Sequence, residues 1–352
     1  MERKYKKSML LLITLILVTT VVVFQGNDAA AVFAAIGTVA LPWLLLGIGL
    51  ALLFVSLEGF IIWYLLHSAE RKVSLPSCIR WSFIGFFFSG ITPSSTGGQP
   101  MQVYYMKQKG VPVSESTPVL MIVAVLYKLI LVLVGIGIWL FQKDSLKMYF
   151  GSYLWLYYLG LLLNTTLVVF LVFIMVSPVL SRKILLGAEN VLVTIRILKQ
   201  SQERRAKLAG FVAEYQDVVY SFKHKKGKLL IAAMITLLQR CCPFLIMWVV
   251  YRGLGLTGTG ILTIVILQAA VTIAVDLLPL PGAAGITELV SAAVFAGIFP
   301  GELLAAALCV SRGISFYIVM LLSGMLLLFR RQWLCGILGK RMLCALKRAD
   351  GS

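Results

Sequence analysis

The chain has 352 residues, of which 60% are hydrophobic and 13% are charged, whereas about 25% of the residues in a typical soluble domain are charged. A soluble fold of this length cannot bury so much apolar surface, which excludes the soluble enzyme and soluble binding-domain classes. The formal net charge is +18. Because the basic residues flank apolar segments, we expect them to face a membrane surface and not nucleic acid.

Six apolar segments approach or exceed the roughly 20 residues that cross about 30 Å of hydrocarbon as a helix. Hydrocarbon cannot satisfy backbone polar groups, so we expect these segments to be helical. The first segment follows a basic stretch, as in a signal peptide, but no small-residue cleavage site comes after it. We therefore expect an uncleaved first span. The six predicted spans are residues 9–24, 39–66, 117–141, 153–177, 229–251 and 303–329.

The basic residues predict the orientation of these spans. Of the 32 Lys and Arg residues, 26 fall in five segments that we assign to the cytoplasm by the positive-inside rule. We therefore expect a multi-pass protein of the cell membrane with both termini in the cytoplasm. The cytoplasmic segments are 1–8, 67–80, 104–116, 180–228 and 330–352, and the outer loops are 25–38, 142–152, 252–260 and 299–302.

Two apolar segments have both flanks on the same side of the membrane. Residues 81–103 have cytoplasmic flanks and a Gly/Pro-rich break at 90–100, whereas residues 261–299 have outer flanks and a break at 276–288. Each is predicted to enter the membrane and return as a re-entrant hairpin. Such interruptions in corresponding positions of two halves point to an inverted repeat with a substrate site near the midplane. The alternative is that each break merely kinks one packed helix.

We therefore predict one all-α polytopic membrane domain with about six full spans and two re-entrant helical hairpins. Residues 1–180 form the first half and residues 229–329 the second. Between them, residues 181–228 carry 11 basic and 4 acidic residues. Their apolar residues recur at helical spacing, so we expect amphipathic helices along the cytoplasmic face. Residues 330–352 form a basic cytoplasmic tail.

Six ionisable residues fall within predicted membrane segments, where each costs at least roughly 2.5 kcal/mol at a helix centre. One explanation is that they neutralise one another in buried pairs. The other is a polar site, since the three cations lie roughly 14 to 17 Å deep and helix N-termini near Pro100 and Ile286 would also attract an anion. The cations would hold the phosphate of a phospholipid headgroup, and the carboxylates would balance charge or bind an amine. The cations are Lys128, Arg240 and Arg312, and the carboxylates are Glu58, Asp276 and Glu288.

The two breaks add further candidate lipid-binding residues. Glycine lets a ligand approach the backbone closely, and hydroxyl groups offer hydrogen bonds without charge. The hydroxyls include Ser94, Ser95, Thr96 and Thr287. The predicted binding residues in the breaks are Thr92, Pro93, Gly97, Gly98, Gln99, Pro279, Pro281, Gly282 and Gly285.

Several motifs of other functional classes are absent from the sequence. It has no G-x-x-x-x-G-K-[ST] phosphate loop, no G-x-S-x-G and no H-E-x-x-H, so we predict no cofactor, no ATP-driven step and no catalytic residue. The six cysteines include no C-x-x-C pair. Because both histidines lie at predicted membrane edges, we also predict no metal site.

The two breaks resemble the two signatures of the lysylphosphatidylglycerol synthase transmembrane-region family. They are Thr-Pro-Ser-Ser-Thr-Gly-Gly-Gln-Pro at 92–100 and Leu-Pro-Leu-Pro-Gly-Ala-Ala-Gly-Ile-Thr-Glu at 278–288, with Arg312 further on. The resemblance covers residues 9–329. Two positions depart from the family pattern: Ala283 stands where a second glycine is frequent, and the amides of Gln99 and Gln102 stand where an arginine often follows Gly-Gly.

This family includes the flippase half of phosphatidylglycerol lysyltransferases, the multiple peptide resistance factors. The resemblance implies translocation of an anionic or aminoacylated phospholipid, such as lysyl-phosphatidylglycerol, across the bacterial cytoplasmic membrane, contributing to resistance to cationic antimicrobial peptides. One alternative is a lysyl-tRNA-dependent phosphatidylglycerol lysyltransferase, although no soluble segment is long enough for the synthase domain. Another is a membrane partner of a separate synthase, bound through residues 181–228. Assembly into an oligomer is compatible with each.

Overall fold

The computed structural model of the chain describes residues 29–92, 95–194, 202–278, 283 and 285–327. All the regular structure in these ranges is helical. Five helices in the described ranges are long and apolar enough to cross a membrane, and they coincide with five of the six predicted spans. The first predicted span, residues 9–24, lies outside the described residues. The five helices are Leu41–Ser68, Val113–Phe141, Lys143–Val176, Lys226–Gly253 and Leu303–Leu327.

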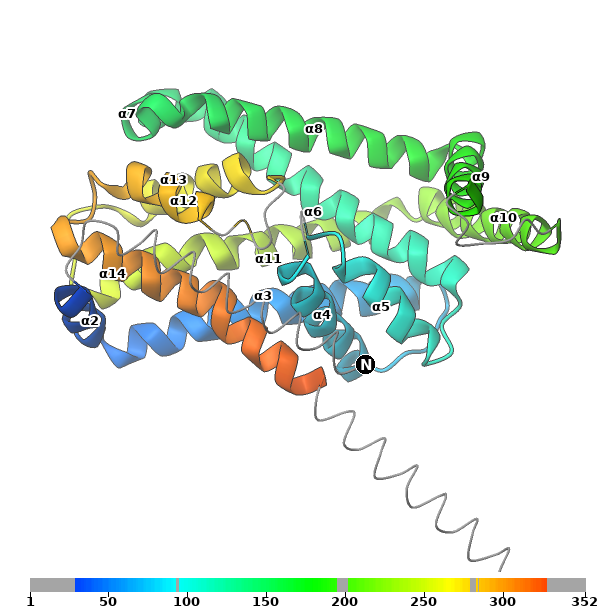
Figure 1. Cartoon of the computed structure of the whole chain (residues 1–352), viewed down its shortest axis with the longest axis horizontal. Coiled ribbons are helices and arrows are strands. Elements are labelled where there is room, and N and C mark those ends of the chain that lie inside the picture. Colours follow the sequence, from blue (N-terminus) through cyan, green and yellow to red (C-terminus); the bar gives the residue numbers. More distant parts are fainter. Residues whose placement is uncertain (1–28, 93–94, 195–201, 279–282, 284, 328–352) are drawn as a thin grey trace, which may run out of the picture.

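Three long helices run lengthwise through the molecule (Figure 1). They are α3 (Leu41–Ser68), α6 (Val113–Phe141) and α11 (Lys226–Gly253). The Ala40 N–H donates to the Gly253 carbonyl at 3.0 Å, and the Lys225 ammonium donates to the Ser68 carbonyl at 2.6 Å. The start of each of α3 and α11 therefore lies beside the end of the other, so these two helices pack antiparallel.

Two short helices occupy segments that the sequence predicts as outer loops. They are α2 (Ala29–Gly37) and α7 (Lys143–Phe150), and α7 leads through η2 (Gly151–Tyr153) into α8 (Leu154–Val176). Val32 of α2 and Phe150 of α7 are almost fully buried. Each of these segments folds because its apolar face packs on the bundle. A topology predicted from charges alone does not detect such packing.

The predicted connector 181–228 is occupied by α9 (Pro178–Thr194) and α10 (Gln202–His224). Tyr215 and Phe222, which belong to the apolar stripe predicted for α10, are buried. The Tyr215 hydroxyl donates to Met121 Sδ at 3.1 Å. The apolar stripe of α10 is therefore packed against α6, and not simply laid on a membrane surface.

A pair of short helices stands at each predicted hairpin. The first pair is α4 (Leu75–Gly90) and α5 (Gly98–Lys107), and the second is α12 (Ile261–Val275) and α13 (Ile286–Phe295). The first pair lies in the half of the molecule toward α9 and α10, and the second in the half toward α2 and α7 (Figure 1). At 1.5 Å per residue, α12 reaches only about 22 Å, less than the roughly 30 Å of hydrocarbon. Membrane re-entry and the inverted repeat stay predictions.

Glycines hold each short pair tightly against a long helix. A Cβ atom at Gly59 of α3 would lie 2.4 Å from the Cα of Ile79 in α4, and a Cβ at Gly160 of α8 would lie 2.2 Å from the carbonyl oxygen of Ile273 in α12. Small residues of this kind let membrane helices approach backbone to backbone. Close packing of α4 on α3 therefore helps to position the first break, and close packing of α12 on α8 helps to position the second.

The last described helix contains a change of pitch. It begins as α14 (Gly301–Arg312), continues as the π-helix η4 (Gly313–Ile318) and returns to α-helix through residue 327. π-Helical turns are rare and are often found at functional sites. Here the change of pitch begins directly after Arg312.

Candidate functional site

Both breaks open onto one cavity of about 270 Å³. This volume is just below the usual range for small-molecule sites, so it has room for a small polar group and not for a whole lipid. Helices α6, α11, α12, α13 and α14 and the η4 turn complete the wall. The break regions contribute Ser89, Gly90 and Ser95 on one side and Asp276, Leu278 and Ala283 on the other.

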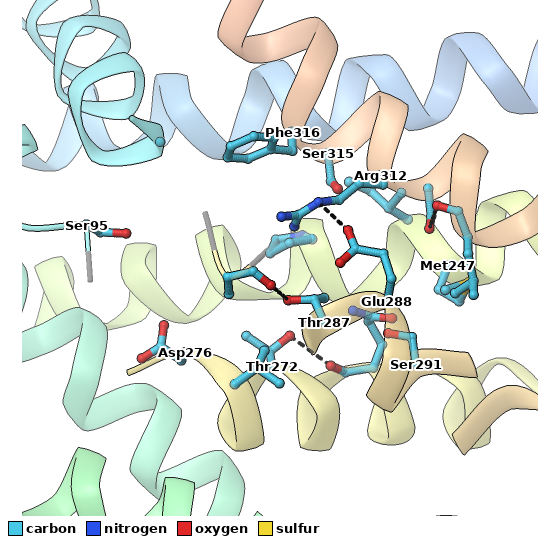
Figure 2. Close-up of a pocket in the computed structure, with 18 of the residues that line it drawn as sticks. Ser95, Met247, Thr272, Asp276, Thr287, Glu288, Ser291, Arg312, Ser315 and Phe316 are labelled. Atoms are coloured by element: carbon cyan, nitrogen blue, oxygen red, sulfur yellow. Dashed lines mark hydrogen bonds and ion pairs between the residues drawn. The ribbon is translucent and has the colours of Figure 1, made fainter. Parts of the chain in front are cut away.

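An ion pair between α13 and α14 lines this cavity. Arg312 Nε lies 2.9 Å from Glu288 Oε1, and Figure 2 shows the Glu288 carboxylate directed at the guanidinium. Glu288 Oε2 also accepts a 2.7 Å hydrogen bond from the Gly285 N–H. Because Glu288 is the third residue of α13, its carboxylate caps the helix N-terminus and interacts favourably with the positive end of the helix dipole. The Arg312 guanidinium lies 4.5 Å from the ring centroid of Phe316.

A second ion pair joins the other side of the cavity to α6. Asp276, which directly follows α12, pairs with Lys128. Both side chains are mostly buried, at 13% and 15% exposure. Asp276 lines the cavity and Lys128 does not. Four of the six predicted intramembrane ionisable residues thus form two pairs, as the pairing explanation expects, and three of those four face the cavity.

Arg240 is buried directly behind the cavity wall. Its side chain is 2% exposed, and its guanidinium carbon lies 4.0 Å from the ring centroid of Tyr127 and 5.3 Å from that of Phe244. Within the described ranges, its Nε and Nη2 have no hydrogen-bond partner. A cation–π contact contributes about 0.5–2 kcal/mol, whereas a buried ion loses several kcal/mol of hydration. The rings therefore compensate only part of that loss.

Glu58 lies at the first helix pair. Gln102 Nε2 of α5 donates to Glu58 Oε1 of α3 at 2.7 Å, and neither residue lines the cavity. A Cβ at Gly85 of α4 would lie 2.3 Å from Gln102 Nε2. The amide is therefore held between α3 and α4, and Glu58 belongs to neither of the two ion pairs.

The predicted residues of the first break form its turn. The Gly97 N–H donates to Thr92 Oγ1 at 2.8 Å. Cβ atoms at Gly97 and Gly98 would lie 2.6 Å from Thr92 Cγ2 and 2.1 Å from Ser89 Oγ, so these glycines let the turn close onto α4. Thr92, Gly97, Gly98 and the exposed Gln99 do not line the cavity. Pro93, Pro279, Pro281 and Gly282 lie outside the described residues.

Each break places one strained residue on the cavity wall. Ser95 has a φ of 56° and Ala283 a φ of 50°, in the left-handed region that favours glycine. Non-glycine residues in this region cost on the order of 1–3 kcal/mol and cluster at binding and catalytic sites. The resemblance noted in the sequence implies a glycine at position 283, and the backbone conformation of Ala283 also favours glycine.

The sequence prediction missed most of the uncharged polar lining. Three helices each present two polar side chains four residues apart, a spacing that places both on the same helix face. Of these, only Thr287 was singled out from the sequence. The signal that would have found the rest is the repeat of that spacing within otherwise apolar helices. The pairs are Gln268 and Thr272, Thr287 and Ser291, and Ser311 and Ser315.

The described ranges contain no group of three or more His, Cys, Asp or Glu side chains that could hold a metal ion. Cys78, Cys241, Cys242 and Cys309 are free thiols, and Cys335 and Cys344 lie outside the described residues. The polar groups of the cavity are therefore ion pairs, hydroxyls and amides, which suit recognition of a charged organic group.

Comparisons with known proteins agree with the resemblance noted in the sequence. A family model described as "Lysylphosphatidylglycerol synthase TM region" matches residues 9–323. A curated relative, the UPF0104 membrane protein PH1989 of Pyrococcus horikoshii, is 24% identical over 280 residues, which cover 76% of this chain and 81% of the relative. The range matched by the family model includes both breaks, both ion pairs and Arg240.

Proposed function

The chain belongs to the lysylphosphatidylglycerol synthase transmembrane-region family, and we propose that it moves an anionic or aminoacylated phospholipid between the leaflets of the bacterial cytoplasmic membrane. The observation that carries this proposal is that both helix breaks and the Arg312–Glu288 pair line the same cavity. A polar cavity among membrane helices offers a headgroup a path through hydrocarbon that it could not otherwise enter.

In this proposal the headgroup enters the cavity while the acyl chains stay outside it in the hydrocarbon. The phosphate replaces Glu288 as the partner of Arg312, whose planar fork of donors matches phosphate oxygens. An ammonium group on the lipid pairs with the released Glu288. A zwitterionic ligand can thus exchange ion-pair partners without leaving a buried charge alone, which would be costly.

We also propose the orientation predicted from the basic residues. Arg71 pairs with Glu115 near one end of the bundle, and this carboxylate raises the pKa of the Arg71 guanidinium. In the proposed orientation, this end of the bundle, which includes α10 and the rest of the basic connector, faces the cytoplasm. Delivery of an aminoacylated lipid to the outer leaflet would lower the negative surface charge there and so contribute to resistance to cationic peptides.

A leaflet-exchange assay tests the proposal. The full chain is reconstituted in vesicles that contain fluorescent phosphatidylglycerol or its lysyl form, and the rate at which label reaches the outer leaflet is measured by chemical quenching. The cavity variant Arg312→Gln/Glu288→Gln removes both charges together, so it leaves no unpaired buried ion. The matched control, Arg71→Gln/Glu115→Gln, removes an ion pair away from the cavity.

The expected result is faster exchange with the wild-type chain than in protein-free vesicles. Losing one charge-assisted hydrogen bond weakens binding by about 1.5–3 kcal/mol, so the cavity variant should be at least roughly tenfold slower, and the control should match the wild type. Exchange no faster than in protein-free vesicles contradicts translocation. An unchanged rate in the cavity variant contradicts the site. Lysyl transfer from lysyl-tRNA by the purified chain, which we expect to be absent, would establish the lysyltransferase instead.

A further inference from the structure

Among the described residues, Arg240 has no carboxylate partner, unlike the other two cations near the cavity. Lys128 and Arg312 each pair with a carboxylate, whereas the Arg240 guanidinium lies over the rings of Tyr127 and Phe244. Its Nε and Nη2 have no hydrogen-bond partner in the part of the chain that the structure describes. A buried guanidinium whose donors lack protein partners has the chemistry to bind an anion.

The Tyr127 ring contacts both this cation and the cavity. Tyr127 lines the cavity, and the same ring stacks on Arg240, with 4.0 Å between the guanidinium carbon and the ring centroid. We infer that Arg240 is a second binding station for a phosphate oxyanion, and that Tyr127 covers it until an anion replaces the ring. This inference rests on the proposed translocation in taking a lipid headgroup as the anion that reaches the cavity.

The backbone around Arg240 favours such an exchange. Pro243 lies inside α11 and lines the cavity. Because proline has no N–H, the carbonyl of Gln239 lacks its usual helical donor, and this turn of the helix is less restrained than its neighbours. Arg240 lies within this turn. A small change in the turn would bring its free donors toward the cavity without moving the rest of α11.

A binding experiment on the purified full chain in phosphate-free detergent tests the second station without requiring transport. The probes are radiolabelled inorganic phosphate and short-chain phosphatidylglycerol. Tyr127→Ala removes the covering ring and should raise phosphate affinity about tenfold, because binding no longer has to displace a cation–π contact. Tyr127→Phe keeps the covering ring, so its phosphate affinity should stay well below that of Tyr127→Ala. The gain should disappear in Tyr127→Ala/Arg240→Gln.

A matched control comes from the C-terminal end of α11. Arg252 lies over the Trp43 ring, with 5.8 Å to its centroid, so adding Arg252→Gln to Tyr127→Ala removes a cation over an aromatic ring away from the cavity and should leave the gain intact. If Tyr127→Ala folds poorly, Tyr127→Leu keeps the bulk without the aromatic face and should show the same gain.

Unchanged affinity in both Tyr127→Ala and Tyr127→Leu, or a gain that persists without Arg240, overturns the second station. A gain with both probes supports a station for any phosphate oxyanion, and a gain with phosphatidylglycerol alone supports a lipid headgroup as its ligand. Failure of leaflet exchange together with a gain that depends on Arg240 would contradict the proposed translocation and leave the station standing.

Discussion

The Arg312–Glu288 pair should respond unequally to the loss of either partner. Arg312→Gln leaves the Glu288 carboxylate, which is 2% exposed, without its cation. Removing one partner of a buried pair costs about 3–5 kcal/mol. Because the Gly285 N–H still donates to Glu288 Oε2, we expect a loss near the lower limit, about 3 kcal/mol in the free energy of unfolding.

Glu288→Gln should cost less, for two reasons found in the site. The remaining Arg312 side chain is 14% exposed and keeps its contact with the Phe316 ring, and a glutamine oxygen can still accept from the Gly285 N–H. We expect a loss of about 1–2 kcal/mol. The double variant should lose no more than Glu288→Gln alone, because no uncompensated charge remains.

Reversible unfolding in mixed micelles, followed by circular dichroism, measures these differences. As a control, Arg71→Gln acts on a pair whose side chains are 47% and 19% exposed, and it should cost only about 0.2–1 kcal/mol. Equal losses in the two single variants, or a double variant whose loss equals their sum, would refute the reasoning.

Two glycine substitutions test how the short helix pairs are held. Gly160→Ala places a methyl group 2.2 Å from a backbone oxygen of α12, so it should cost about 1–3 kcal/mol of stability in the same unfolding assay. Its control, Gly137→Ala, has no atom within 4 Å of the added carbon and should stabilise by up to about 1 kcal/mol. A tolerated Gly160→Ala would show that α8 and α12 are not in close contact. Gly85→Ala should displace the Gln102 amide from Glu58 and cost about 1–3 kcal/mol. Once Gln102→Leu has removed that hydrogen bond, Gly85→Ala should cost clearly less, and fully additive losses would contradict the displacement.

The fold elements that follow from local sequence were predictable, and those that depend on packing were not. The long apolar runs predicted five helices that the structure contains, because span length depends only on the thickness of the hydrocarbon. The helices at 29–37 and 143–150 were missed because they are short and form by packing on the bundle. The pattern of apolar residues gives no signal for the π-helical turn after Arg312.

For the site, the sequence identified the ionisable residues and left their pairing undetermined. Burial cost predicts that charges inside a membrane need partners, and it does not say which ones. Lys128 and Asp276 are 148 positions apart, so only the tertiary fold brings them together. The same limit applies to Arg240, whose unused donors become visible only when the rings of Tyr127 and Phe244 are in place.

The separation between Lys128 and Asp276 also has a consequence for biosynthesis. At about 5–20 residues per second, the ribosome needs roughly 7–30 s after Lys128 to make Asp276. During this interval the lysine enters the membrane without its carboxylate, at a translocation cost of about 2.5–3.5 kcal/mol. Its helix, Val113–Phe141, is the most apolar of the five candidate spans in the described ranges. The surplus hydrophobicity of α6 thus carries the lysine into the bilayer ahead of its partner, and the ion pair is completed only late in synthesis.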